Sequence, residues 1–231
     1  MSNTLTPGRR FKAVLSEENP LQLMGTINAY CARMAKSVGY KAIYLSGAGI
    51  ANASYGIPDI GETTLENVCE DIRRVSAVVD TPLIVDMDTG WDDPKYSVEK
   101  FIEAGAAGAH IEDQASAKKC GHLNNKQLIS IDEMVARIKA AVSGKKADPD
   151  FYLIARTDAF ANEEMAGVIA RSQAYLDAGA DAIFAEAFTE LSQYKTFCEK
   201  IKAPVLANIT EFGKTPLYTV DELKSVGVQI V

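Results

Sequence analysis

The stretch Glu103-Ala-Gly-Ala-Ala-Gly-Ala-His-Ile111 decides the fold, because it joins the end of a helical pattern to a short apolar run through a glycine. A glycine at a helix C-terminus can take the left-handed conformation that releases the chain into a strand. The same phrase recurs as Lys36-Ser-Val-Gly-Tyr-Lys-Ala-Ile-Tyr-Leu45, Asp177-Ala-Gly-Ala-Asp-Ala-Ile-Phe184 and Lys224-Ser-Val-Gly-Val-Gln-Ile-Val231. This repeat predicts helix-to-strand transitions along the whole chain.

Other apolar runs lie between these points, and each is followed by a polar turn and an amphipathic helical pattern. They are Leu83 to Val85, Phe151 to Ala155 and Pro204 to Ala207, and a first run begins near Gln22-Leu-Met-Gly-Thr26. The pattern gives about eight strands, the last at Val228 to Val231. Strands that alternate with helices imply a parallel sheet that is covered on both faces.

Eight such units favour an α/β fold of the closed (β/α)8 TIM-barrel type over an open doubly wound sheet. The chain has no G-x-G-x-x-G after its first strand, which weakens the dinucleotide-binding alternative. The clearest helix is expected from Asp132 to Val142, where Ser130 and Glu133 form a capping-box pattern. Because no linker divides the sequence, we expect one domain over residues 1–231.

The composition excludes several classes of protein. The chain has 231 residues with 24 Lys and Arg against 31 Asp and Glu, so its formal net charge is −7, which argues against a nucleic-acid or membrane-surface protein. The cysteines Cys31, Cys69, Cys120 and Cys198 have no C-x-x-C spacing and are interpreted as reduced thiols in a cytoplasmic protein. No apolar stretch approaches the length of a membrane span.

Polar residues follow nearly every expected strand, at the end where the active sites of such barrels lie. These residues are Ser46 and Gly47, Asp86 and Asp88, Glu112 and Asp113, Arg156 and Asp158, Glu186, Asn208 and Thr210. A purely structural barrel would need no such ring, so the pattern predicts an active site there.

Asp86 and Asp88 are two residues apart, so their side chains point the same way in an extended strand. Two neighbouring carboxylates are costly to bury unless a cation neutralises them, and oxygen ligands suit Mg²⁺ better than Zn²⁺. The alternative interpretation is that one of the pair caps the next helix. His110 lies inside an apolar run and is interpreted as a core or barrel-lining residue.

The segment Lys118-Lys-Cys-Gly-His122 is polar and basic and follows the fourth strand. Nearby lysines and an imidazolium lower the pKa of a thiol, which allows Cys120 to exchange a proton near neutral pH. A Cys and His pair also suggests a thiol hydrolase, but that interpretation leaves the carboxylates of the third strand unexplained. A metal-assisted carbon–carbon lyase uses both features: the metal polarises a hydroxy or keto carboxylate and the cysteine protonates the released carbanion.

Several of these motifs resemble the isocitrate lyase and phosphoenolpyruvate mutase superfamily, and within it the 2-methylisocitrate lyase branch. The resemblance covers essentially the whole chain. It is carried by Tyr44-Leu-Ser-Gly47, Pro58-Asp59, Val85-Asp-Met-Asp-Thr-Gly90, Ala106 to Gln114, Lys118 to His122 with Lys126, Ala155-Arg-Thr-Asp158 and Leu206 to Gly213. The Lys-x-Cys-Gly-His motif is specific to the lyase branches, and Asn208 to Leu217 points to the 2-methylisocitrate lyase branch.

The resemblance implies cleavage of 2-methylisocitrate to pyruvate and succinate, in the methylcitrate cycle of propionate catabolism. It implies Mg²⁺, or Mn²⁺, held by Asp86 and Asp88 with Asp59 and Glu112 in support. The catalytic group would comprise Cys120 as the acid, His122, Lys118, Arg156 and, as a candidate base, Tyr44. The residues implied to contact the substrate are Ser46, Gly47, Ala48, Gly121, Arg156, Glu186, Asn208 and Thr210.

The chain departs from the family pattern in two places. Trp91 to Glu103 is about one helical turn shorter than its counterpart, and the sequence stops at Val231, which we interpret as truncation in or after the eighth strand, without the usual C-terminal helical region. The family implies a homo-oligomer. Alternatives within the enzyme class are isocitrate lyase or a related oxaloacetate or alkylmalate lyase. The alternative of another class is a non-catalytic barrel that binds dicarboxylates or associates with a homologue.

Overall fold

The computed structural model describes residues 5–115, 127–211 and 213–231. Its sheet contains seven strands, which are β1 (Leu23–Thr26), β2 (Ala42–Leu45), β3 (Leu83–Asp86), β4 (Gly108–Glu112), β5 (Tyr152–Thr157), β6 (Ala182–Ala185) and β7 (Val205–Leu206). All neighbouring pairs are parallel, and the strands lie in the sheet in their order along the chain. The alternating α/β architecture predicted from the sequence is confirmed.

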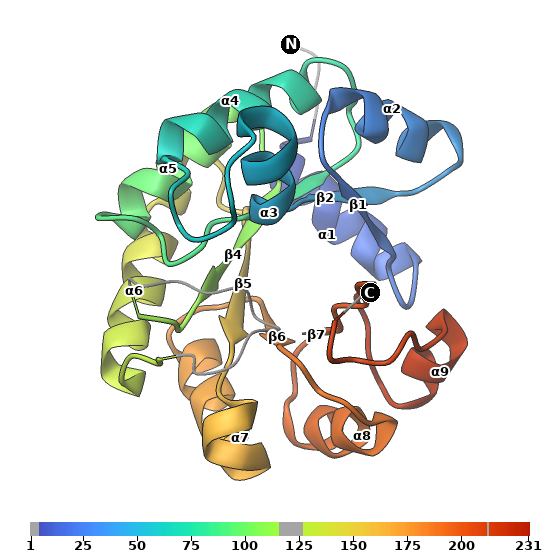
Figure 1. Ribbon diagram of the computed structural model, residues 1–231, viewed down its shortest axis with the longest axis vertical. Helices are drawn as coiled ribbons and strands as arrows, with labels where there is room; N and C mark the ends of the chain where they lie inside the picture. The colour runs from blue at the N-terminus through green and yellow to red at the C-terminus, as the bar shows by residue number, and fades with distance from the viewer. Residues whose placement is uncertain (1–4, 116–126, 212) are drawn as a thin grey trace.

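Helices connect the strands and surround the curled sheet (Figure 1). They are α1 (Pro7–Glu17), α2 (Ala29–Ser37), the short α3 (Gly47–Gly49), the π-helix η1 (Ile50–Tyr55), α4 (Leu65–Ser76), α5 (Pro94–Ala104), α6 (Ile131–Ser143), the 3-10 helix η2 (Lys145–Ala147), α7 (Phe160–Asp177), α8 (Leu191–Lys200) and α9 (Val220–Ser225). No helix among the described residues is both long and apolar enough to span a bilayer.

The glycines of the repeated phrase do what the sequence predicts. Gly39, Gly105, Gly179 and Gly227 have φ angles of +100°, +105°, +108° and +92°, in the left-handed region that ends a helix. The capping box also forms, because Ser130 Oγ accepts the Glu133 N–H and the Glu133 carboxylate accepts the Ser130 N–H. Local sequence therefore sets where α2, α5, α7 and α9 end and where α6 begins.

The expected strand at Val228 to Val231 is not formed as a named strand. Only Ile230 makes bridges, one to Leu21 and one to Leu206, and both are parallel. Backbone hydrogen bonds join this segment to both sides, from Leu21 N to Gln229 O at 2.9 Å and from Ala207 N to Ile230 O at 2.9 Å. Bridges at one residue are too few to define a strand, although Ile230 lies where the eighth strand was expected.

Strand alternation divides the apolar core into two clusters. Residues such as Leu153 and Ala155 of β5 pack against the surrounding helices, whereas Tyr152 and Ile154 point to the inside of the curled sheet. Phe11 of α1 belongs to the inner cluster and is fully buried, with its ring 4.8 Å from that of Tyr152. Helix α1 therefore packs against the inner cluster at the amino-terminal end of the strands.

We predict that Phe11→Ala destabilises the protein by about 3–5 kcal/mol, because it removes a fully buried ring from a packed cluster. Chemical denaturation followed by circular dichroism measures the change. Tyr30→Ala is the matched control, since Tyr30 is 71% exposed and its truncation should cost no more than about 0.5 kcal/mol. Equal losses for the two variants would show that α1 does not stabilise the inner cluster.

Candidate active site

Polar side chains replace the apolar inner layer at the carboxyl ends of the strands. On each strand they continue the inward-pointing positions of the inner cluster: Tyr44 follows Ala42, Asp86 follows Ile84, Arg156 follows Ile154 and Glu186 follows Phe184, each two residues further along. Asp86, Glu112, Arg156 and Glu186 are all buried. Part of the ring of polar residues expected from the sequence is therefore an interior layer of side chains, whereas Ser46, Asn208 and Thr210 are half-buried and Asp113 contacts α7 on the other face of the sheet.

Arg156 is the centre of this layer. Its guanidinium forms a bidentate pair with Asp158, with Nε 3.0 Å from Oδ2 and Nη2 3.1 Å from Oδ1. Glu112 Oε2 lies 3.4 Å from Nε and Glu186 Oε2 lies 3.3 Å from Nη2. Burial opposes the charge of Arg156, but these three carboxylates together raise its pKa well above the ordinary value. Arg156 therefore remains a cation in the interior.

Phe184 supports the same guanidinium from another side. The guanidinium carbon of Arg156 lies 5.0 Å from the centroid of the Phe184 ring, within the range of a cation–π interaction. The sequence analysis did not place Phe184 in the site. Its place in the site could have been predicted, because Phe184 lies on β6 two residues before Glu186. That spacing points both side chains in the same direction.

Asp86 is held by backbone donors. Its Oδ2 accepts the Gly47 N–H at 3.1 Å and its Oδ1 accepts the Asp88 N–H at 3.0 Å. A Cβ at Gly47 would lie 2.8 Å from Asp86 Oδ2 and 3.5 Å from Asp88 Oδ1, so a side chain there would press on both carboxylates. Asp86 and Asp88 thus lie together facing a glycine, but the extended strand expected to align them is wrong, because β3 ends at Asp86 and Asp88 has a φ of +48°.

Tyr44 and His110 lie beside Asp86. The hydroxyl oxygen of Tyr44 is 2.7 Å from His110 Nε2, and the same nitrogen is 3.4 Å from Asp86 Oδ1. Burial, and then the negative charge of Asp86, raise the pKa of Tyr44 well above its ordinary value. His110 is fully buried and packs against the rings of Tyr44 and Phe184, as its interpretation as a barrel-lining residue requires.

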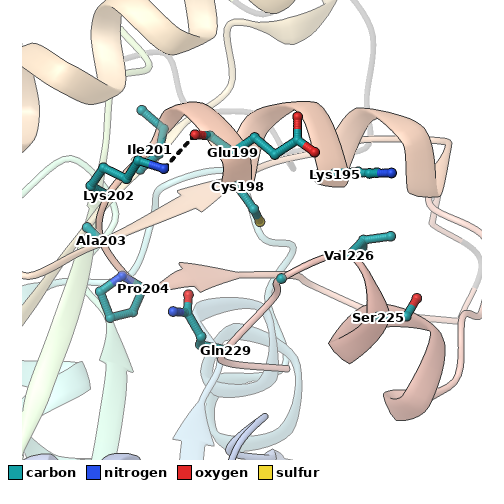
Figure 2. Close-up of a pocket in the computed structure, with 11 residues that line it drawn as sticks. Lys195, Cys198, Glu199, Ile201, Lys202, Ala203, Pro204, Ser225, Val226 and Gln229 are labelled. Carbon is teal, nitrogen blue, oxygen red and sulfur yellow. Dashed lines mark hydrogen bonds between the residues drawn. The ribbon is translucent and has the colours of Figure 1, made fainter.

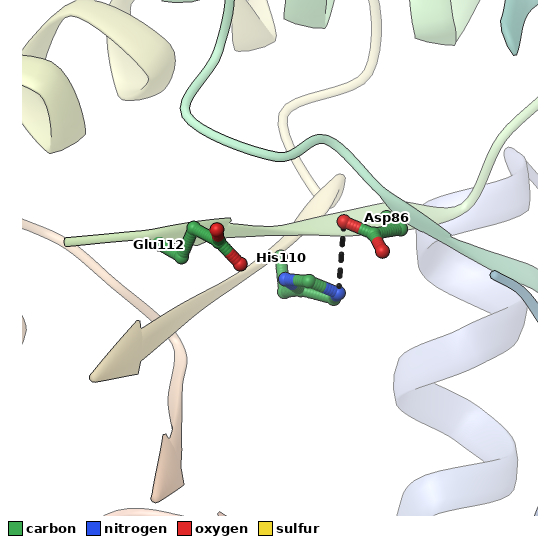
Figure 3. Close-up of side chains that lie close together, drawn as sticks. All are labelled: Asp86, His110 and Glu112. Atoms are coloured by element: carbon green, nitrogen blue, oxygen red, sulfur yellow. Dashed lines mark ion pairs between the residues drawn. The ribbon is translucent and has the colours of Figure 1, made fainter. Parts of the chain in front are cut away.

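His110 also completes a group of possible metal ligands that the sequence analysis did not identify. One ligand atom from each of Asp86, His110 and Glu112 lies within 4.8 Å of the others (Figure 3). The β3–β4 register places Asp86 directly beside His110, and Glu112 is two residues further along the same strand. The spacing of His110 and Glu112 was visible in the sequence, but the register that brings Asp86 beside them was not.

The donor atoms of the layer fit a bound metal ion. The buried carboxylates of the layer are Asp86, Asp88, Glu112, Asp158 and Glu186. Arg156 is the only lysine or arginine among the described residues that line the cavity above them. Buried carboxylates need a cation or extensive hydrogen bonding to remain charged. The group formed by Asp86, His110 and Glu112 could hold a divalent metal ion, and its mainly oxygen donors are of the type that Mg²⁺ prefers.

A cavity of about 450 Å³ opens over this layer. Nine residues predicted for the site line it: Tyr44, Ser46, Ala48, Asp59, Asp86, Arg156, Glu186, Asn208 and Thr210. Gly47, Asp88 and Glu112 contact these residues from the layer beneath, as described above. Lys118, Cys120, Gly121 and His122 lie outside the described residues. The cavity is large enough for a small polycarboxylate.

A second cavity, of about 500 Å³, lies between α8 and α9 beside Pro204, which precedes β7 (Figure 2). It is therefore at the opposite end of the strand from the polar layer. Among its polar side chains, Lys202 donates a hydrogen bond to the backbone oxygen of Glu199 at 2.8 Å, and Gln229 accepts one from the Val205 N–H at 3.1 Å. Its size does not make it the candidate site, because the buried charged residues converge on the other cavity.

Comparison with known proteins shows which family the chain resembles. The family model for phosphoenolpyruvate phosphomutase matches residues 11–231. The 2-methylisocitrate lyase of Escherichia coli (strain K12) is 53% identical over 227 residues, which span 96% of this chain and 76% of that protein.

Two solved structures share the fold over nearly the whole chain. An oxaloacetate acetylhydrolase in complex with 3,3-difluorooxalacetate superposes with a TM-score of 0.93 and 35% identity, covering 97% of this chain and 78% of that one. A phosphonopyruvate hydrolase in complex with oxalate and Mg²⁺ superposes with a TM-score of 0.83 and 28% identity, covering 98% and 80%.

We predict that Arg156→Met destabilises the protein by about 3–5 kcal/mol, because it leaves several buried carboxylates without their cation. Urea denaturation measures the loss. Arg33→Met is the matched control, since Arg33 is exposed and the same truncation should be nearly neutral there. A stability unchanged by Arg156→Met would mean that the carboxylates are neutralised in another way.

Proposed function

The chain belongs to the phosphoenolpyruvate phosphomutase family, and from this membership we propose that it is a carbon–carbon lyase that cleaves 2-methylisocitrate into pyruvate and succinate. The observation that carries the proposal is the 53% identity to a 2-methylisocitrate lyase along 96% of the chain. The sequence Lys118-Lys-Cys-Gly-His122 supports the lyase chemistry. The reaction would serve the methylcitrate cycle of propionate catabolism.

The proposed reaction needs a proton to leave the substrate hydroxyl and another to reach the carbanion. As the hydroxyl proton departs, the carbon–carbon bond breaks, the hydroxyl carbon becomes the keto carbon of pyruvate, and the electron pair stays on the succinate fragment. We propose that Cys120 gives its thiol proton to that carbon, in a segment where Lys118 and His122 favour the thiolate that remains. The second product is then succinate.

Tyr44 is the proposed acceptor of the hydroxyl proton. Its raised pKa makes the phenolate a strong base but a rare one, so the phenol needs a neighbour that can take its own proton. His110 Nε2, 2.7 Å from the Tyr44 oxygen, meets that need when the neutral imidazole carries its proton on Nδ1. We therefore assign the two residues to one proton path.

We propose that the remaining cavity residues bind the substrate carboxylates and hydroxyl. Arg156 supplies a fixed positive charge, Ser46, Asn208 and Thr210 supply polar side chains, and Gly47 and Ala48 supply space next to Asp86. Glu186 orients Arg156, and Gly121 belongs to the cysteine motif. A bidentate guanidinium is well suited to a carboxylate, although Asp158 already holds one edge of Arg156.

Asp86 and Asp88 are the proposed holders of a Mg²⁺ ion, with Glu112 and Asp59 in the supporting shell. When bound, the ion supplies Lewis-acid polarisation of the substrate oxygens. Mn²⁺ is the alternative ion, because it also accepts carboxylate ligands and tolerates an imidazole such as His110. The clustered ligand atoms of Asp86, His110 and Glu112 support a divalent ion of either kind.

The finer description of the fold is also part of the proposal. We propose that residues 229–231 close the curled sheet between β1 and β7 as the eighth strand of a (β/α)8 barrel, supported by the two bridges of Ile230. The family resemblance further suggests a cytoplasmic homo-oligomer, which native mass spectrometry would test.

The direct test is pyruvate release from 2-methylisocitrate in the presence of Mg²⁺, followed with lactate dehydrogenase. Isocitrate and oxaloacetate are assayed beside it by the consumption of each substrate, measured by mass spectrometry, because a solved oxaloacetate acetylhydrolase shares the fold closely. We expect the highest kcat/KM with 2-methylisocitrate. Faster turnover of another substrate would reassign the enzyme within its class, and binding without any turnover would favour the non-catalytic barrel.

We predict that Cys120→Ser lowers kcat by about 10²–10⁴-fold, the usual contribution of a general acid. Cys198→Ser is the matched control and should keep its activity, because Cys198 lies near the second cavity. Iodoacetamide should also alkylate Cys120 before Cys69 and Cys198, since burial raises the pKa of each of those two thiols to about 11. Full activity of Cys120→Ser would remove the proposed acid.

We predict that EDTA abolishes turnover and that added Mg²⁺ restores it and raises the melting temperature. Asp86→Asn should lose that thermal shift, because it removes one carboxylate charge at the proposed ion. Asp71→Asn is the control, since Asp71 is a buried carboxylate on α4 that pairs with Arg74 and Ser54 instead. A Mg²⁺ shift retained by Asp86→Asn would place the ion elsewhere.

A further inference from the structure

A second buried network lies behind the proposed active site, and its centre is Asp113. This residue follows Glu112 directly at the end of β4, but the two side chains point to opposite faces of the sheet. Glu112 approaches Arg156 inside, whereas Asp113 contacts α7 through Arg171 and Tyr175. Asp113 is fully buried, and a buried carboxylate needs hydrogen bonds or a nearby cation, which these contacts supply.

The two oxygens of Asp113 have different partners. Oδ2 accepts the Tyr175 hydroxyl at 2.8 Å and lies 3.5 Å from Arg171 Nη1. Oδ1 accepts the backbone N–H of Asp158 at 2.9 Å. Tyr175 and Arg171 are one helical turn apart on α7, so they face Asp113 together. One oxygen thus joins Asp113 to the helix, and the other joins it to the end of β5.

The contact with Asp158 leads directly to the site. The Asp158 carboxylate forms the bidentate pair with Arg156, and the backbone of Asp158 is the point that Asp113 holds. Arg171 is anchored in turn by two hydrogen bonds to Glu163, at 2.8 and 2.6 Å, and by one to the backbone oxygen of Ile129 at 2.9 Å. The chain of contacts from α7 to the Arg156 guanidinium is continuous.

We infer that Asp113 is a positioning residue for the lyase reaction, which holds the Asp158 backbone so that the Asp158 carboxylate fixes Arg156 in the orientation that binds the substrate. This inference rests on the proposed function for its substrate. It assigns Asp113 no contact with that substrate, since the side chain lies on the other side of the sheet. A guanidinium held at two nitrogens keeps a fixed orientation toward a bound ligand. If the Asp158 backbone is no longer held, the Arg156 guanidinium loses that fixed orientation.

Asp113→Ala and Asp113→Asn form a matched pair that tests the inference. Both remove the charge, but only the asparagine keeps an oxygen that can accept the Asp158 N–H. We expect Asp113→Ala to lower kcat/KM for 2-methylisocitrate by about 10–100-fold, as outer-shell substitutions do, and Asp113→Asn to recover most of that loss. Tyr175→Phe removes the hydroxyl that contacts Asp113 Oδ2 and Arg171 but leaves the Asp158 N–H contact at Oδ1, so it should lower the melting temperature while leaving kcat/KM unchanged.

A double-mutant cycle with Arg156→Lys separates positioning from general destabilisation. If Asp113 acts through Arg156, Asp113→Ala should change kcat/KM much less in the Arg156→Lys background than in the wild type. Equal losses in the two backgrounds, or equal kinetics of Asp113→Ala and wild type, would overturn the inference.

Hydrogen exchange distinguishes failure of this inference from failure of the proposed function. The segment 157–160 should exchange faster in Asp113→Ala than in Asp113→Asn, whether or not the protein turns over 2-methylisocitrate. A wild-type protein without turnover but with this exchange pattern would contradict the proposed function and retain the anchor. Unchanged exchange in Asp113→Ala would reject the anchor itself.

Discussion

The buried guanidinium of Arg156 is the interaction on which the interior of the site depends. It lies within ion-pair distance of Asp158, Glu112 and Glu186, which come from the carboxyl ends of three consecutive strands or the turns that follow them. Without a cation at this point, these carboxylates would repel one another in a region that water reaches poorly. With it, they bind together the ends of β4, β5 and β6. The same cation faces the cavity, so structure and ligand binding use one group.

The strand period of two residues explains how so much charge is buried above an apolar core. Inward positions on one strand pass from Ile154 to Arg156, while the outward neighbours Leu153 and Ala155 remain apolar and pack against helices. A shift of one residue in the register would place Arg156 among those helices. The continuous outer packing therefore fixes the inner polar layer, although no outer residue contacts a ligand.

Much of this arrangement was predictable because it is encoded locally. The glycines of the repeated phrase and the capping box at Ser130 are local signals, and the structure confirms both. The polar residues that follow the strands are also a local signal, and their role stays a prediction. What local signals cannot predict also has a physical reason. The expected eighth strand would need pairing with both Leu21 and Leu206, which local sequence does not encode, and the structure forms only the isolated bridges of Ile230 there.

The least predictable features need a partner from another strand or helix. His110 was interpreted as a lining residue, which it is, but its place beside Asp86 follows from the β3–β4 register. The contacts of Asp113 join residues 45 to 62 positions apart. No local pattern in the sequence predicts such pairs, so the sequence suggested candidate residues for the site and left their contacts open.

Glu112 and Asp113 show how one strand end can serve two regions at once. Consecutive residues in extended backbone point to opposite faces, so Glu112 belongs to the Arg156 layer and Asp113 to the packing against α7. Because both are fully buried, neither face can relax by exposing its carboxylate to water. A displacement of this backbone would therefore break contacts on both sides together. That shared cost makes the end of β4 a rigid support for the adjacent ends of β3 and β5, where the proposed metal ligands and Arg156 lie.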